Sequence, residues 1–139
     1  MNGTVYLPAE CGEQLKRRAR EDYPREACGL LVGSRKDREV RVQRITEARN
    51  LHPEGRNDRY LLDPEHFLQT DRVAEEEGSE ILGVWHSHPG QPAVPSATDR
   101  ESAWSGWSYL IVSIGPEVGE NVRAWRLCQG CFLEETLRG

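Results

Sequence analysis

The sequence lacks any apolar run approaching the roughly 18 residues that a membrane-spanning helix needs. It also lacks a signal peptide, because residues 1–4 lead directly into the short apolar segment 5–7. The four cysteines are therefore expected to be reduced thiols, as is usual in the cytoplasm. Together these features predict a cytoplasmic protein with no membrane partner.

Basic residues are also in short supply. The chain has 18 lysines and arginines against 23 aspartates and glutamates, which gives a formal charge of −5. Proteins that bind duplex nucleic acids usually carry a basic patch. The short basic cluster Arg17-Arg18-Ala19-Arg20 falls on a predicted helix and is interpreted as its solvated side. No nucleic-acid partner is therefore expected.

The length and apolar content of the chain are those of one folded domain. It has 139 residues, of which 37% are hydrophobic and 29% charged, so a sizeable core and a polar surface are both available. It shows no internal repeat, low-complexity tract or linker. The sequence predicts a single domain over residues 1–139.

Apolar patterning and turn residues divide the chain into helices and strands. Helices are predicted at residues 8–20, 64–77 and 96–104, the second capped by Asp63 and facing inward with Phe67, Val73 and Ala74. Strands are predicted at residues 5–7, 27–33, 40–45, 59–62, 81–85, 109–114 and 121–128, and residues 132–137 form a strand or a terminal helical turn. This order predicts an α+β fold of α/β-like, three-layer type, with a mixed central sheet flanked by two or three helices.

Two histidines follow the apolar strand at residues 81–85. His86 and His88 are two positions apart, so they would project from the same side of an extended strand. The loop after them is rich in proline and glycine and leads to Ser96 and Asp99 at the start of a predicted helix. Two imidazoles and a carboxylate form a common ligand set for catalytic zinc, whose fourth position stays open to water.

Each part of this segment also has a purely structural interpretation. A histidine at a strand end often only reaches solvent, and Ser96-x-x-Asp99 is a variant of the helix capping box. The prolines and glycines could simply make a rigid turn. The capping role and the metal role are compatible, because the first turn of the helix would place Asp99 beside the histidines.

The combined pattern resembles the signature of the JAMM (MPN+) zinc metallopeptidases. His86-Ser87-His88, seven residues, Ser96, two residues and Asp99 match its second block, and Pro24-x-Glu26-x-Cys28-Gly29 matches its first. The resemblance implies the JAMM/MPN fold, which is similar to that of cytidine deaminases. It also implies that His86, His88 and Asp99 bind Zn²⁺, that Glu26 is the general base, and that Ser96 hydrogen-bonds the oxyanion.

The implied reaction is hydrolysis of an amide or isopeptide bond. Eukaryotic members grip ubiquitin with two insertions. The predicted strand at Tyr109 follows Asp99 within ten residues, which leaves little room for the second insertion, and the first would fall near residues 63–78, where only one ordinary helix is predicted. The compact form resembles prokaryotic members, some of which act on small ubiquitin-like sulfur-carrier proteins with a Gly-Gly tail or on their amino-acid adducts. An extended tail would suit a groove beside a sheet edge. The alternatives are a non-catalytic MPN-type interaction scaffold and a phage-tail or cell-wall peptidase.

The pair Cys128 and Cys131 forms a single C-x-x-C, which could be redox-active or half of a metal site. Without further cysteine or histidine partners, it is interpreted as two strand-end thiols. Nucleoside deaminases combine His-x-Glu with Pro-Cys-x-x-Cys. Here His88 stands in place of the glutamate and Leu127 in place of the proline, so the deaminase interpretation fails at two required residues.

Overall fold

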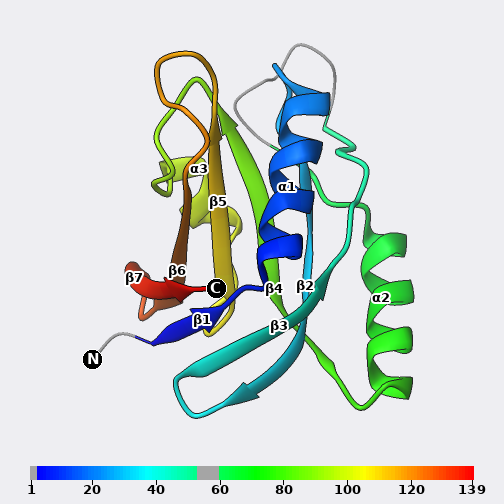
Figure 1. The fold of residues 1–139 in the computed structure, drawn as a ribbon. Helices are drawn as coiled ribbons and strands as arrows, with labels where there is room; N and C mark the ends of the chain where they lie inside the picture. The colour runs from blue at the N-terminus through cyan, green and yellow to red at the C-terminus, as the bar shows by residue number, and fades with distance from the viewer. Residues whose placement is uncertain (1–2, 53–59) are drawn as a thin grey trace.

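The structure is a computed structural model that describes residues 3–52 and 60–139 (Figure 1). The strands are β1 (Thr4–Tyr6), β2 (Cys28–Lys36), β3 (Glu39–Ile45), β4 (Glu80–Pro89), β5 (Ser108–Ile114), β6 (Val122–Cys128) and β7 (Cys131–Arg138). The helices are α1 (Ala9–Asp22), α2 (Pro64–Glu76) and α3 (Ala97–Ser102). The terminal segment is therefore a strand, and the predicted α+β class with three helices is confirmed.

The sheet is mixed and closes on itself in the order β1-β3-β2-β4-β5-β6-β7. β1 completes the circle, because it pairs in parallel with β3 on one side and with β7 on the other. β4 and β5 are also parallel, and the remaining neighbours are antiparallel. The sequence predicted a mixed sheet but not its closure. Each of these seven strands consequently has a neighbour on both sides, although β1 pairs with only three residues of β3 and three of β7.

β4 is the strand around which the molecule is built (Figure 1). It pairs with β2 and β5, and its residues from Ile81 to His88 are all buried. Gly83 allows the close approach to β5, since a Cβ at this position would lie 1.7 Å from the carbonyl oxygen of Ser108. The strand runs to Pro89, beyond the predicted end at Trp85, so both histidines lie within it.

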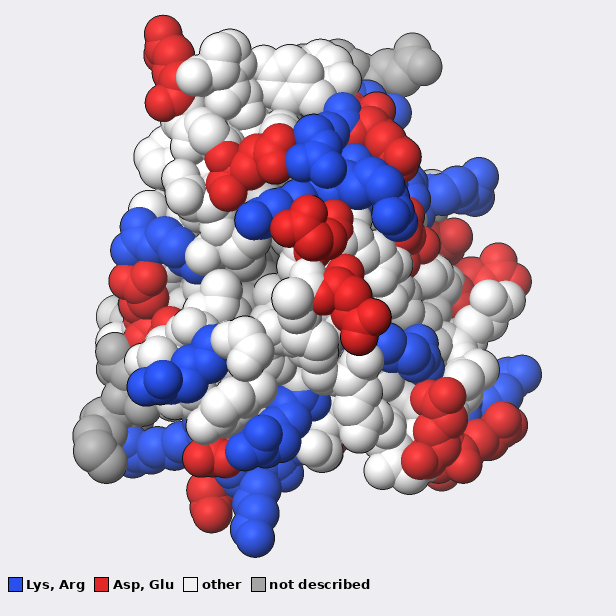
Figure 2. Space-filling model, viewed as in Figure 1, with Lys and Arg blue, Asp and Glu red and all other residues white. Residues whose placement is uncertain are grey.

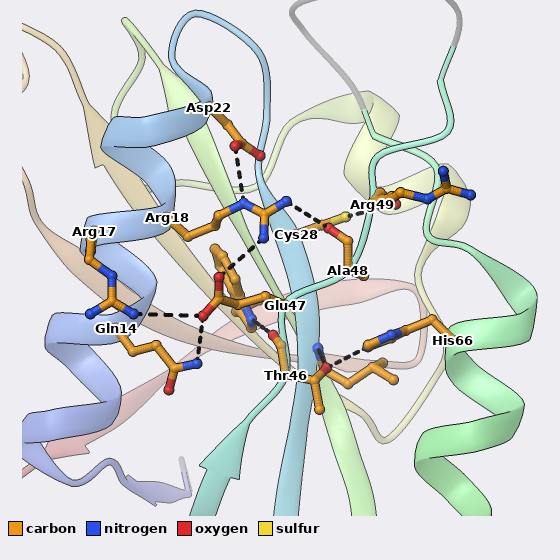
Figure 3. Close-up of polar contacts among 12 residues, drawn as sticks. Gln14, Arg17, Arg18, Asp22, Cys28, Thr46, Glu47, Ala48, Arg49 and His66 are labelled. Carbon is orange, nitrogen blue, oxygen red and sulfur yellow. Dashed lines mark hydrogen bonds and ion pairs between the residues drawn. The ribbon is translucent and has the colours of Figure 1, made fainter.

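α1 packs an apolar stripe of Cys11, Leu15 and Ala19 into the larger core cluster, which also contains Trp85 and Leu110. On its polar side, the Arg18 guanidinium donates to Asp22 Oδ1 at 3.0 Å and to Glu47 Oε1 at 3.1 Å (Figure 3). This part of the basic cluster is therefore not simply solvated, because it fastens α1 to the segment that follows β3.

α2 begins as predicted, with the Asp63 carboxylate accepting a hydrogen bond from the Glu65 amide and Pro64 in the first turn. The prediction that Val73 faces inward is wrong: its side chain is 45% exposed, whereas Thr70 and Ala74 are buried. The buried stripe follows the i, i+4 spacing of Thr70 and Ala74, and Val73 is turned about 100° away from Ala74. Phe67 is half-buried, as part of a second core cluster.

The predicted strand at residues 59–62 does not form in its described part. Leu62 makes only an isolated bridge with Asn50. Arg59 lies outside the described residues, as do residues 53–58 of the turn-rich stretch 50–58. No helix within residues 3–52 and 60–139 is both long enough and apolar enough to span a membrane. On the face shown in Figure 2, acidic and basic side chains are interspersed, and neither sign dominates.

Candidate active site

The two histidines owe their position to the alternation of β4. Val84, His86 and His88 share one face of the strand, while Trp85 and Ser87 share the other. Both imidazoles are almost fully buried, and their ring centroids lie 5.0 Å apart. The prediction that they project side by side is therefore confirmed.

A short loop and α3 bring Asp99 to the same place. The loop is tied down where the Gly90 amide donates to the Ile114 carbonyl at 2.8 Å and where Trp125 Nε1 donates to the Ala93 carbonyl at 3.1 Å. At the start of α3, the Asp99 amide donates to Ser96 Oγ at 3.0 Å and the Ser96 amide donates to Asp99 Oδ2 at 2.8 Å. This capping box, predicted from the sequence, fixes the Asp99 carboxylate against the histidines.

The three side chains have the spacing of a metal-binding group. His88 Nε2 lies 2.9 Å from Asp99 Oδ2, and His86 Nε2 lies 3.6 Å from Asp99 Oδ1. The ligand atoms of all three residues lie within 4.8 Å of one another. Two ligands on a tetrahedral zinc with bonds of about 2.0–2.1 Å are themselves separated by about 3.3 Å. The arrangement therefore fits a small divalent cation.

Hydrogen bonds around the ligands support the same interpretation. His88 Nδ1 lies 3.0 Å from the Pro92 carbonyl oxygen, to which it can only donate, so Nε2 is left to face Asp99. Metal-binding histidines commonly use the second ring nitrogen in this way. Burial alone would lower the pKa of His88, but the hydrogen bond that its ring donates to Asp99 and the negative charge of Asp99 raise it. Burial alone would raise the pKa of Asp99, but the His86 charge and the hydrogen bonds from His88 and Ser96 lower it to about 2. The space between these atoms favours a positive charge.

Glu26 lies beside the metal-binding group, on the segment between α1 and β2. Its side chain is buried, and Oε1 lies 3.4 Å from His86 Nδ1. Within the described part of the chain, neither of these two atoms has a hydrogen-bond partner. The structure thus brings together four of the five residues singled out from the sequence in one buried cluster, joined to Ser96 through the helix cap.

The sequence pattern of the family described as prokaryotic homologues of the JAB domain matches residues 8–128. The chain belongs to this family. The match runs from the start of α1 to the end of β6, so it includes the whole cluster described above.

Three relatives whose names describe an activity are similar to this member of the prokaryotic JAB family. A desampylase from Haloferax volcanii is 39% identical over 112 residues, which cover 77% of this chain and 78% of that protein. A probable TtuB-protein conjugate cleaving protease from Thermus thermophilus is 32% identical over 126 residues, 91% of this chain and 78% of that protein. A CysO-cysteine peptidase from Mycobacterium tuberculosis is 32% identical over 138 residues, 96% of this chain and 91% of that protein.

A solved structure agrees with the fold. The solution structure of a protein from Desulfitobacterium hafniense superposes with a TM-score of 0.85 at 30% sequence identity, covering 96% of this chain and 90% of that one. The relatives are JAMM-type peptidases, so the resemblance drawn from the two sequence blocks is confirmed.

Several residues of the site were missed at the level of sequence. The Tyr60 ring stacks on the His86 imidazole with a centroid distance of 4.6 Å. The Ser87 hydroxyl, on the opposite face of β4, accepts from the Ala27 amide at 2.8 Å and so holds the residue next to Glu26. Asn50 Nδ2 donates to the Glu26 carbonyl at 3.0 Å. Tyr60 and Asn50 lie in neither motif block. Ser87 lies between the two histidines of the second block, but only the tertiary fold shows that it contacts the segment of Glu26.

An apolar cleft opens beside the cluster, with a volume of about 490 Å³. It is lined by aromatic and aliphatic side chains of α2, of the segment before it and of the segment after α3, among them Tyr60, Leu61, Phe67, Trp104 and Trp107. Trp104 is 60% exposed, so it lines the cleft and is not packed in the core. Tyr60 belongs to both the cleft and the histidine site, which makes the two continuous.

The C-x-x-C pair lies at the turn between β6 and β7. Cys128 ends β6 and Cys131 begins β7, where they face each other across the turn and are both free thiols. Their placement as strand-end cysteines is as predicted. The described histidines, cysteines and acidic residues form one group with metal-binding spacing, His86, His88 and Asp99, and it excludes this pair.

Proposed function

We propose that this chain is a zinc-dependent hydrolase, acting as a single JAMM domain over residues 1–139. The bond cleaved is an amide or isopeptide bond at the C-terminal Gly-Gly tail of a small ubiquitin-like sulfur-carrier protein, or in its amino-acid adduct. The observation that carries the proposal is the convergence of His86, His88 and Asp99 with the buried carboxylate of Glu26. A cytoplasmic location remains part of the proposal.

The cluster divides into a ligand set and an acid-base group. His86 and His88 would bind zinc through Nε2, because Nε2 is the atom that each ring turns toward Asp99. When bound, zinc supplies a Lewis acid for the scissile carbonyl and lowers the pKa of water toward about 7. The nitrogen and oxygen donors and their burial suit that ion.

Glu26 is proposed as the general base. Its Oε1 would accept a proton from the attacking water and return it to the leaving amine, which restores the carboxylate for the next turnover. Within the described residues Oε1 has no hydrogen-bond partner, and its nearest basic atom, His86 Nδ1, is 3.4 Å away, so Oε1 keeps acceptor capacity for water. Ser96 is proposed as the oxyanion donor: Oγ accepts from the Asp99 amide, and its own proton remains available to donate.

The surroundings of the cluster support a protein tail as substrate. β4, which carries the histidines, pairs with β2 on one side and with β5 on the other, so recognition by strand pairing along β4 is not favoured. The apolar cleft, joined to the site through Tyr60, instead suits a bulky apolar side chain a few residues before the scissile bond. The names of the three relatives point to this substrate class, since they describe cleavage of protein conjugates and of a cysteine adduct.

The test uses the zinc-loaded protein, a carrier-protein–lysine conjugate and a carrier-protein–cysteine adduct, with products read by mass spectrometry. We expect cleavage after the terminal glycine of the carrier. Glu26→Gln should keep one zinc per chain and the fold but reduce kcat by about 10²–10⁴-fold, the range of general acid-base catalysis. A Glu26→Gln variant with full activity would remove Glu26 as the base.

Two other outcomes separate an enzyme from a scaffold. If Glu26 only orients His86, then Glu26→Gln should lose zinc in proportion to activity, because outer partners of ligands act through metal affinity. If the native protein binds no zinc and cleaves neither substrate, the chain is a non-catalytic interaction domain of the same fold.

A further inference from the structure

We infer that Asn50 is a positioning residue for Glu26. It connects the backbone segment that carries Glu26 to Leu61, which lines the apolar cleft. The inference rests on the proposed function, because it assigns Asn50 a part in the reaction through Glu26. Three hydrogen bonds carry it. Asn50 Nδ2 donates to the Glu26 carbonyl at 3.0 Å, and Oδ1 accepts from the amides of His52 and Leu61, each at 2.9 Å.

Glu26 depends on such support because its own carboxylate is not held by a hydrogen bond. It lies between α1 and β2, outside both elements, and in the described part of the structure Oε1 has no hydrogen-bond partner. Its direction is therefore set by the backbone on either side. Ser87 Oγ holds the following amide, that of Ala27, and Asn50 holds the carbonyl of Glu26 itself. A base that must reach a proton within hydrogen-bond distance is sensitive to such placement.

The segment that carries Asn50 is itself anchored to α1 and β2. Figure 3 shows Glu47 receiving hydrogen bonds from Gln14 and Arg18, at 2.8 and 3.1 Å. Arg18 also reaches the Ala48 carbonyl, and the Ala48 amide donates to the Cys28 carbonyl at 3.0 Å. Asn50 thus links this anchored segment to the segment that carries Glu26.

Asparagine suits this position because the three bonds need one donor and one doubly accepting oxygen in the same short side chain. Aspartate would keep the acceptor for His52 and Leu61 but could not donate to the Glu26 carbonyl. The substitution Asn50→Asp therefore removes the link to the base and leaves the link to Leu61, which lines the cleft. A matched control is Asn121→Asp, since the Asn121 amide is exposed and donates to Val118 within its own turn.

In the zinc-loaded protein we expect Asn50→Asp to lower kcat by about 10–100-fold, as a small misplacement of a catalytic group does, with KM within about twofold of wild type. Zinc content and Tm should match those of Asn121→Asp. Hydrogen exchange at the Ala27 amide, measured by NMR, should become faster in Asn50→Asp alone. The double variant Glu26→Gln/Asn50→Asp should have a kcat no lower than that of Glu26→Gln, because the placement of residue 26 no longer affects the rate once the base has been removed.

Wild-type kcat in Asn50→Asp would overturn the inference. So would an additive double variant, or a loss of kcat that follows a lower Tm or zinc content, because Asn50 would then be structural only. Should Asn50→Asp fail to fold, Asn50→Ser keeps a short hydroxyl for the local turn without reaching Glu26, and the same kcat loss is expected. Full activity of Glu26→Gln would instead refute the proposed base, and the Ala27 exchange rate would still report whether Asn50 holds this segment.

Discussion

The two faces of β4 contain similar kinds of side chain in opposite states. On the face toward α1, the polar atoms are satisfied by the protein: Trp85 Nε1 donates to the Thr46 carbonyl at 2.8 Å, and Ser87 Oγ accepts from Ala27. On the other face, His86 Nδ1 and Glu26 Oε1 are buried without hydrogen-bond partners in the described structure. His86 is therefore as buried as its neighbours Trp85 and Ser87, but its Nδ1 has no hydrogen-bond partner in the described structure, whereas their polar atoms do.

This difference separates what folds the protein from what it does. Buried polar groups are normally satisfied, because leaving one unpaired costs about 1–3 kcal/mol. The face toward α1 follows that rule and stabilises the sheet. The histidine face violates it in the way expected of a site that binds a cation and a substrate. Substitutions on the two faces should therefore affect different measurements.

The largest effect should come from removing a ligand. His88→Ala or Asp99→Ala leaves two protein ligands where three hold the ion, so we expect zinc content after dialysis to fall from about one per chain to near zero. Cleavage should fall by more than about 10³-fold, since the Lewis acid and the activated water are lost together. Zinc measured by mass spectrometry of the digested protein, beside the cleavage rate, checks this.

The control is His66→Ala, which removes a histidine from α2, on a different element from the ligands. It should keep its zinc. A His88→Ala protein with wild-type zinc content would show that the cation, if bound, sits elsewhere.

The opposite face should respond in stability. Trp85 is fully buried in the larger core cluster, so Trp85→Ala should lower the free energy of unfolding by about 3–5 kcal/mol. Trp85→Phe keeps most of the ring volume and loses the indole bond to Thr46, at a cost of about 1 kcal/mol. Urea denaturation measures both. The folded Trp85→Phe protein should keep its zinc and its kcat within about twofold; loss of zinc at unchanged stability would show that the two faces are not independent.

The sequence was most informative where the determinants are local. The pairing of His86 with His88 follows from strand alternation, and the approach of Asp99 follows from the capping box at Ser96, so both were predicted correctly. The position of Glu26 required the family pattern, because nothing within a few residues of a glutamate before a strand distinguishes it from a surface carboxylate. Glu26 is buried, as a residue of the site should be, and its role as general base is a proposal that the Glu26→Gln variant would test.

The features that sequence reasoning missed depend on distant contacts. β1 is only three residues long, and its pairing with β7 joins residues near opposite ends of the chain. The periodicity of apolar residues along the sequence therefore cannot predict that the sheet closes. Tyr60 and Asn50 themselves lie outside the helices and strands, and Val73 differs from Ala74 only in which side of α2 the sheet covers. The local sequence pattern predicts helices and strands, whereas the residues against which each face packs depend on the tertiary fold.

The smallest expected effect concerns His66, a structural histidine that contrasts with the two at the metal site. Its Nε2 lies 2.8 Å from the Thr46 hydroxyl, which already accepts from the Leu30 amide, so the hydroxyl proton can be donated to the neutral ring (Figure 3). Burial lowers the pKa of His66, against a smaller opposing influence of Asp63.

Because the folded protein then binds this proton less readily than the unfolded chain, stability should be lost as the pH falls below about 6.5 and regained above it. His66→Gln removes the titration. We expect the drop in Tm between pH 7.5 and pH 5.5 to be smaller in His66→Gln than in wild type by about 1–2 °C, a small value because the ring is partly solvated. An identical drop in both proteins would show that His66 does not contribute to the acid sensitivity and packs equally well in either protonation state.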